Sequence, residues 1–297
     1  MIGTHGVKMA NAAVNECDVL FLVGARVGDR AVKTPLALEK TTKIIHIDID
    51  PAEIGKNIGA DLPLVGDAKL VLQQMTELAK PMKHDEWIAH IKTLGGERKY
   101  VEPAKGTVNP RVFIDRLAKK MPANVTVVAD VGQNQIWTCT EYKFRKEGRL
   151  LTSGGMGTMG YSVPAAIGAK MADNSRATVA ICGDGAFQMS FMELATAVQF
   201  GVDIKVVVMT NNRLGMVREL QTNGYHDRQT AVFLDGSPDF IKLAEAYGIP
   251  AMRVYDDDTM DKGLLNIKAF ALLKSLWIRI CQHYEANILT ICSVYSI

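Results

Sequence analysis

The chain has 297 residues, of which 48% are hydrophobic and 22% are charged, and its formal net charge is +2. A length near 300 residues favours two domains, because single hydrophobic cores stop growing near that size. The small, scattered charge excludes the basic surface that nucleic acids or anionic membranes require. No apolar run reaches the length of a membrane span, so we expect a soluble protein without nucleic-acid or membrane partners.

The five cysteines are odd in number and contain no Cys-x-x-Cys pair. A disulfide framework is therefore not expected, and a reducing, cytoplasmic location fits best. His84 and His90 lie close together without cysteine partners. For this pair, solvated positions on a helix are favoured over a zinc site.

The first part of the chain alternates helical segments with short apolar strands. Helices are expected near residues 10–15 and 68–79, and strands at residues 19–23 and 43–49. Strands of this kind are typical of a parallel sheet that is covered on both faces. The pattern predicts a first domain over residues 1–80.

A polar segment follows over residues 81–108, with a short helix expected around Trp87. Its glycines and prolines are typical of a linker. A second alternation then predicts another domain over residues 109–258. Two of its expected helices cover residues 110–120 and 164–171, a third begins at a capping box over residues 190–193, and a fourth runs from Ser237-Pro238, which would cap it, to Gly248. Its expected strands cover residues 125–129, 150–152, 178–182, 204–209 and 251–255.

The predicted fold class is therefore α/β, with two doubly wound parallel-sheet domains. Residues 259–297 form an atypical tail, which is apolar without clean periodicity from Leu264 onward. We expect either a terminal helix pair that packs on the core or a segment that is not the natural ending of the domain.

Polar residues follow two of the predicted strands in the second domain. Asp184 comes after one strand, and Asn211 and Asn212 come after the next. Ligands of open parallel sheets bind beyond the carboxyl ends of the strands. A carboxylate and an amide oxygen are ligands that suit Mg²⁺, which also accepts oxygens from a phosphate.

Glycines accompany these residues. Gly183 and Gly185 flank Asp184, and a second glycine turn covers residues 154–160. Glycine lets the backbone approach a phosphate closely, and N–H groups at a helix start attract the anion. Each motif alone is compatible with a plain turn or a strand cap, but their combined spacing predicts a site for a metal-bound diphosphate.

Several motifs resemble the large subunit of acetolactate synthase, a thiamine diphosphate enzyme. The resemblance covers roughly residues 1–258, including the central domain of that enzyme and its diphosphate-binding domain. It rests on Gly3-Thr4-His5-Gly6, Gly24-Ala25-Arg26, His46 to Pro51, Gly66-Asp67-Ala68, Asp130 to Trp137, Ser153 to Gly160, Gly183-Asp184-Gly185, Asn211-Asn212 and Leu214 to Val217.

The resemblance implies roles for these residues. Asp184, Asn211 and the backbone carbonyl of Arg213 would ligate Mg²⁺, with Asn212 as the alternative to Asn211 because the asparagine doublet is shifted by one position. Met159 would be the wedge that holds thiamine bent. The other residues implied in cofactor binding are Val131, Gly132, Gln133, Asn134, Gly157, Gly183, Gly185, Ala186, Leu214, Gly215 and Met216.

The resemblance also implies FAD in the first domain. The alternative is a Rossmann-like core that binds nothing. Gly28 favours this alternative slightly, because the family often has an aspartate near FAD at that position. Leu220 stands where many members have a tryptophan that shapes the substrate pocket, and this smaller side chain leaves the preference for 2-ketobutyrate as acceptor open. The FAD contacts would be Gly3, His5, Gly24, Ala25, Arg26, Asp48, Ile49 and Asp67.

The implied activity joins two pyruvates, or pyruvate and 2-ketobutyrate, with loss of CO2 in branched-chain amino acid biosynthesis. The family's N-terminal domain, which supplies an activating glutamate, has no counterpart before residue 1. We therefore expect a fragment that is inactive alone, from a homo-oligomeric parent with a regulatory small subunit as a further partner. The alternatives are another pyruvate-using thiamine diphosphate enzyme, or a non-catalytic module that binds the cofactor.

Overall fold

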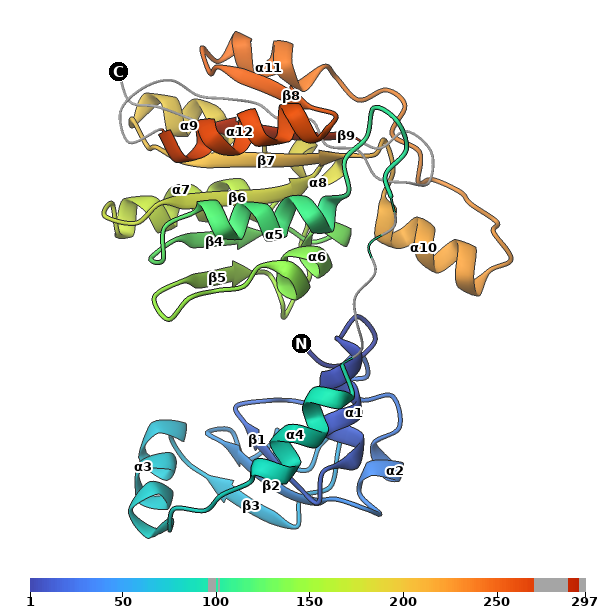
Figure 1. The fold of residues 1–297 in the computed structure, drawn as a ribbon, viewed down its shortest axis with the longest axis vertical. Coiled ribbons are helices and arrows are strands. Elements are labelled where there is room, and N and C mark those ends of the chain that lie inside the picture. Colours follow the sequence, from blue (N-terminus) through green and yellow to red (C-terminus); the bar gives the residue numbers. More distant parts are fainter. Residues whose placement is uncertain (96–99, 101, 270–287, 294–297) are drawn as a thin grey trace. The chain divides into compact units, whose positions relative to one another are not determined.

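The computed structural model of the chain describes residues 1–95, 100, 102–269 and 288–293 (Figure 1). It divides into two compact units, Met1–Arg98 and Lys99–Ile297. The boundary falls inside the segment that the sequence predicts as a linker. No helix in the described part of the chain is long and apolar enough to cross a membrane.

The first unit contains a three-stranded parallel sheet in the order β1-β2-β3. The third strand was not predicted, because it contains Pro63, a residue that is confined to sheet edges. The buried core gathers Leu22, Leu38, Ile44 and Ile58. The elements are α1 (Lys8–Glu16), β1 (Val19–Val23), α2 (Pro35–Leu38), β2 (Lys43–Asp48), β3 (Leu62–Val65), α3 (Ala68–Leu78) and α4 (Asp85–Thr93).

The second unit contains a six-stranded sheet in the order β5-β4-β6-β7-β9-β8. The four strands β5, β4, β6 and β7 are parallel, whereas β9 runs antiparallel to both of its neighbours. The strands are β4 (Thr126–Ala129), β5 (Arg149–Thr152), β6 (Thr178–Gly183), β7 (Lys205–Thr210), β8 (Ala251–Val254) and β9 (Ile288–Ser293).

Helices cover both faces of this sheet, because successive strand residues alternate between two buried clusters. Val127, Val179 and Val207 pack with α5 (Pro110–Lys120), α6 (Gln133–Glu141) and α12 (Asp257–Ala269). Val128, Ala180 and Val206 pack with α7 (Ser162–Ala172), α9 (Glu193–Gln199) and α11 (Phe240–Ala246). This arrangement confirms the doubly wound α/β prediction. Two further helices, α8 (Asp184–Gln188) and α10 (Gly215–Gly224), follow the ends of β6 and β7.

Two predicted helix starts are wrong. The hydroxyl of Ser190 is buried and has no hydrogen-bond partner, and α9 begins at Glu193 without a side-chain cap, so the expected capping box does not form. The carboxylate of Asp239, not Ser237, caps α11 by accepting the N–H of Ile241.

The tail also differs from the expected helix pair. Helix α12 continues to Ala269, but residues 288–293 form strand β9 between β7 and β8. Residues 270–287 and 294–297 of that predicted tail lie outside the described residues. His90, which the sequence places on a solvated helix, contacts Glu16 on α1 with 2.6 Å between Nε2 and Oε2.

Candidate cofactor site

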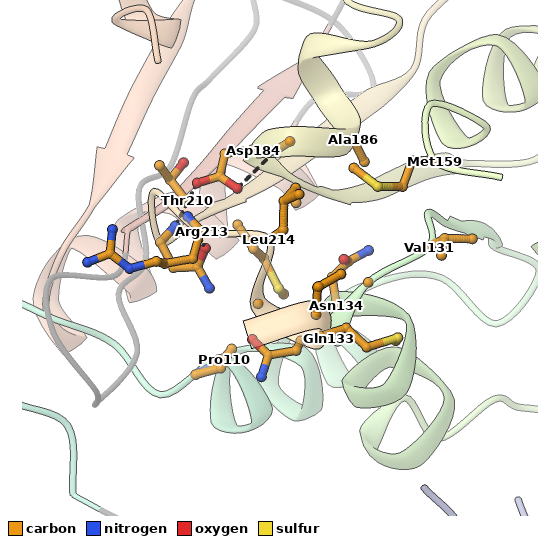
Figure 2. Close-up of a pocket in the computed structure, with 18 of the residues that line it drawn as sticks. Pro110, Val131, Gln133, Asn134, Met159, Asp184, Ala186, Thr210, Arg213 and Leu214 are labelled. Carbon is orange, nitrogen blue, oxygen red and sulfur yellow. Dashed lines mark hydrogen bonds between the residues drawn. The ribbon is translucent and has the colours of Figure 1, made fainter. Parts of the chain in front are cut away.

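The carboxyl ends of β4, β6 and β7 meet at one cavity in the second unit (Figure 2). Strands β6 and β7 are direct neighbours with Gly183 opposite Met209, as the crossover between them predicts. The cavity is lined by Pro110, Val131, Gly132, Gln133, Asn134, Trp137, Met159, Gly183, Asp184, Gly185, Ala186, Met209, Thr210, Asn211, Arg213, Leu214, Gly215, Met216 and Val217.

Asp184 is the carboxylate of this cavity, and its residue is only 1% exposed. Its Oδ1 accepts the N–H of Gly185 at 2.8 Å, and its Oδ2 accepts the N–H groups of Asn211 and Asn212 at 2.9 and 2.6 Å. Burial raises the pKa of Asp184 to about 6, although these three hydrogen bonds lower it. A buried carboxylate without a cation is costly, so the chemistry of this position suits a hard metal ion.

The two asparagines after β7 face different cavities. Asn211 lines the cavity of Asp184, and its Oδ1 accepts the N–H of Arg213 at 3.0 Å. Asn212 has a left-handed backbone with φ of 51° and lines a second cavity together with Asp235 and Asp239. Although the N–H groups of both asparagines bond Asp184, only Asn211 lines the same cavity as that carboxylate.

Arg213 also lines the cavity, but its guanidinium group points away from it (Figure 2). The guanidinium carbon lies 4.3 Å from the ring centroid of Phe233, and Nη1 lies 3.4 Å from Oδ1 of Asp235. These contacts hold the side chain outward. A metal contact from Arg213 would consequently come from its backbone, as the resemblance implies.

The start of α6 forms another wall. Gly132 has φ of 145°, and α6 has no side-chain cap at its N-terminus. The amide nitrogen of Asn134 donates to the carbonyl oxygens of Asp130 and Ile181 at 2.8 and 3.1 Å. A Cβ atom on Gly132 would lie 2.6 Å from Oδ1 of Asn134, so glycine is required there. An uncapped helix start of this kind attracts a phosphate group.

Helix α10 closes the opposite side against α6. Nε2 of Gln133 donates to Oε2 of Glu219 at 3.1 Å, and a Cβ atom on Gly215 would lie only 2.1 Å from Oε1 of Gln133. Glycine at position 215 thus allows the two helix starts to approach. Beside them, a Cβ atom on Gly185 would lie 2.8 Å from Leu214 and 3.3 Å from the methyl group of Met159. Leu214 and Met159 therefore form an apolar wall.

Two predicted site residues do not line this cavity. Gly157 lies in the turn before α7 with φ of 68°, and Leu220 is 54% exposed on α10. The cavity also contains residues that the sequence reading missed. Trp137 and Val217 belong to motifs that carry the family resemblance but were given no site role, Met209 and Thr210 end β7, and Pro110 begins α5 without a chemical signature.

In the first unit, six of the eight predicted FAD residues lie at or just after the carboxyl ends of the three parallel strands. Gly24 follows β1 with φ of 59°, and its N–H donates to Ile47 of β2 at 2.8 Å. Asp48 ends β2, Ile49 beside it is 72% exposed, and Asp67 caps α3 after β3. Ala25 and Arg26 continue from Gly24, while Gly3 and His5 lie in the turn before α1, where Asn11 bonds both backbone groups of Gly3.

Among the described residues, no group of three or more His, Cys, Asp or Glu side chains could hold a metal ion. The candidate metal position at Asp184 would be of another kind, because the ligands that the resemblance implies are one carboxylate, an amide and a backbone carbonyl. Such a donor set leaves coordination positions for phosphate oxygens and water, as Mg²⁺ prefers.

Family models match both units. Residues 1–75 match the central domain of thiamine pyrophosphate enzymes, and residues 130–272 match their C-terminal TPP binding domain. The second match contains most of the residues around the cavity and extends past the predicted domain end at residue 258.

Similar proteins include a probable acetolactate synthase large subunit from Methanocaldococcus jannaschii, which is 41% identical over 275 residues, 89% of this chain and 46% of its own length. The acetolactate synthase large subunit of Lactococcus lactis is 37% identical over 88% of this chain and 46% of its own length. The isozyme 3 large subunit of Escherichia coli is 38% identical over 84% and 45%.

The chain spans about half the length of these curated relatives. Within that span, the two domain matches follow each other in chain order, and each falls within one of the two structural units. The chain therefore belongs to the thiamine pyrophosphate enzymes and is homologous to about half of an acetolactate synthase large subunit.

Proposed function

We propose that the cavity at the ends of β4, β6 and β7 binds thiamine diphosphate through Mg²⁺, in a protein that makes acetolactate. The substrates would be two pyruvates, or pyruvate and 2-ketobutyrate, and CO2 would be released. The match to a TPP binding domain and the names of the relatives support this function. The observation that carries it is the buried carboxylate of Asp184, held by three N–H groups at the edge of the cavity.

In this proposal Asp184, Asn211 and the backbone carbonyl of Arg213 hold the metal ion. The burial of Asp184 favours it because a low-dielectric site strengthens attraction to a cation. The position of Asn211 on the same cavity favours it over Asn212.

The walls of the cavity divide by chemistry. The polar backbone near Asp184 and the start of α6 would hold the diphosphate, from residues Val131, Gly132, Gln133, Asn134, Gly183, Gly185 and Ala186. The apolar wall of Met159, Leu214, Gly215 and Met216 would hold the organic part and exclude water. Thiamine diphosphate, when bound, supplies the carbanion chemistry that pyruvate condensation needs.

FAD is proposed for the first unit, at Gly24, Ala25, Arg26, Asp48, Ile49 and Asp67, with Gly3 and His5. The carboxyl ends of three adjacent parallel strands support a nucleotide there. The match to the central domain is compatible with FAD and does not require it.

Because the relatives are named large subunits, we propose a homo-oligomer and a regulatory small subunit as partners. The described cysteines Cys17, Cys139 and Cys182 are free, which supports a cytoplasmic location. Exposed Leu220 would contact an acceptor substrate only in an assembled site.

A buried tryptophan allows a direct test of cofactor binding. Trp137 lines the cavity and is only 6% exposed, so thiamine diphosphate with Mg²⁺ should quench its fluorescence. The variant Trp137→Phe should lose the quenching signal and retain binding in equilibrium dialysis. An unchanged spectrum in the wild type, together with no retention in dialysis, would contradict the proposal.

Activity needs a separate assay. If the purified chain releases CO2 and forms acetolactate from pyruvate with thiamine diphosphate, Mg²⁺ and FAD, both the expected inactivity of the chain alone and a non-catalytic module are contradicted. Cofactor binding without either product would contradict a synthase activity of this chain and leave the binding function standing.

A further inference from the structure

Asp130 is a fully buried carboxylate that follows β4 and does not line the cavity. Its Oδ1 accepts the N–H of Val131 at 2.9 Å and the N–H of Gly160 at 3.0 Å. Its Oδ2 accepts the N–H of Ser162 at 2.8 Å. One side chain thus joins the end of β4 to a backbone segment about thirty residues later.

The segment that Asp130 holds is the turn before α7. Gly160 has φ of 84°, and a Cβ atom there would lie 3.0 Å from Cβ of Met189 on the other side. The turn is therefore fixed between the carboxylate of Asp130 and the end of α8. Met159, the residue immediately before Gly160, extends its side chain into the cavity toward Gly185 (Figure 2).

A methionine side chain has three rotatable bonds, so its backbone anchor decides which space it fills. We propose that Asp130 is a positioning residue for Met159, and that it shapes the end of the cavity that receives the thiamine rings. This inference rests on the proposed cofactor. It assigns no contact between Asp130 and the ligand, because Met159 would make that contact.

A carboxylate suits this role better than an amide. Three N–H groups converge on two oxygens, and hydrogen bonds to a charged acceptor are shorter and stronger than neutral ones. In Asp130→Asn, the amide nitrogen would face at least one of these N–H groups, donor against donor. The turn would then move, and Met159 would move with it.

A simpler role must be separated from this one, because Asp130 also caps the first turn of α7 through Ser162. The test compares two probes in the same variant: thiamine diphosphate with Mg²⁺, which fills both ends of the cavity, and inorganic pyrophosphate with Mg²⁺, which occupies only the Asp184 end. Calorimetry of Asp130→Asn should show thiamine diphosphate affinity reduced at least about tenfold, while pyrophosphate affinity changes less than about twofold.

The matched control is Asp239→Asn, which makes the same chemical change at the cap of α11. It should leave both affinities within about twofold. A second comparison uses the Met159→Ala background, in which Asp130→Asn should lower the affinity for thiamine diphosphate by less than about threefold. Equal losses for both probes, or an undiminished effect without Met159, would overturn the positioning role.

If Asp130→Asn does not fold, hydrogen exchange of the wild type provides the answer. The amides of Gly160 and Ser162 should exchange slowly and should slow further with thiamine diphosphate but not with pyrophosphate. Equal rates with both ligands would overturn the inference. Wild-type protein that binds neither probe would overturn the proposed function together with this inference, whereas Asp130→Asn with wild-type affinity for both would overturn this inference alone.

Discussion

The two units place aspartates at the carboxyl ends of parallel strands and use them differently. In the first unit, Asp48 accepts the N–H of Asp50, and Asp67 accepts that of Leu70, so each bonds within three residues of itself. In the second unit, Asp184 accepts from Asn211 and Asn212, which lie 27 and 28 residues away.

Burial follows the same division. Asp184 and Asp130 are at most 1% exposed, whereas Asp67 is exposed and Asp48 half-buried. An aspartate that accepts an N–H from a nearby residue stabilises only its own turn. A buried aspartate that accepts N–H groups from distant residues fixes the backbone segments around a cavity. One strand-end motif thus serves two purposes, and substitutions of these aspartates should change thiamine diphosphate affinity strongly in the second unit and little in the first.

The largest expected effect is that of Asp184→Ala. Without this carboxylate the diphosphate meets no metal ion, so affinity for thiamine diphosphate in the presence of Mg²⁺ should fall by about a hundredfold or more. Isothermal titration measures the change. Asp48→Ala, the matched change in the first unit, should leave that affinity within about twofold, and an equal loss in both variants would break the comparison.

The second prediction concerns pH. Because burial raises the pKa of Asp184 to about 6, this carboxyl binds a proton as the pH falls through that value, and the protonated form cannot ligate a cation. Mg²⁺-dependent affinity should fall about tenfold per pH unit below 6. Titrations at a series of pH values test this, and constant affinity between pH 7 and 5 would contradict it.

The same pKa has a consequence for stability without cofactor. The folded state binds this proton more tightly than the unfolded chain, whose carboxyl has the ordinary value of 3.8. The contribution of Asp184 to stability is therefore fully present below 3.8 and is lost as pH rises through about 6. Lowering the pH from above 6 to below 3.8 should therefore raise the free energy of unfolding of the wild type relative to that of Asp184→Ala, as measured by denaturation curves.

A smaller effect distinguishes the two asparagines. Asn211→Ala should weaken cofactor affinity by about tenfold, because Asn211 shares the cavity of Asp184. Asn212→Gly allows the left-handed backbone conformation, with φ of 51°, that Asn212 adopts, and it should lower cofactor affinity by less than about threefold. The reverse order in titrations would show that Asn212 is the metal ligand.

The smallest effect belongs to the first unit. Asp67→Ala removes the cap of α3 and should reduce the free energy of unfolding by about 1 kcal/mol, while Asp67→Asn should cost less. Chemical denaturation followed by circular dichroism measures both. Thiamine diphosphate affinity should not change, and a marked loss would mean that the units do not act separately.

The sequence predicted the strands that have a strong local pattern of apolar residues. The apolar runs at β1, β2, β4, β6 and β7 become strands, and the crossover between β6 and β7 places Asp184 beside Asn211. Periodicity and strand-end chemistry were sufficient for this part. The ligand roles of these residues remain predictions.

Other features depend on long-range packing. Asp130 was noted only as part of a motif, because its bonds to Gly160 and Ser162 arise when the turn before α7 folds back on β4. The hydroxyl of Ser190 matched a capping box in sequence, yet it is buried without a partner. A local sequence pattern does not show which of several polar residues will form a hydrogen bond in the folded protein, because this depends on tertiary contacts.

One pair of titrations tests whether Mg²⁺ holds the diphosphate at Asp184. Thiamine diphosphate is titrated into the wild-type protein by calorimetry, first with Mg²⁺ and then with a chelator in its place. We expect one-site binding with Mg²⁺ and at least about a hundredfold weaker binding without it, on the order of the loss of a buried charged contact. Equal affinity in both titrations, or heat in neither, would contradict a metal-held diphosphate at Asp184.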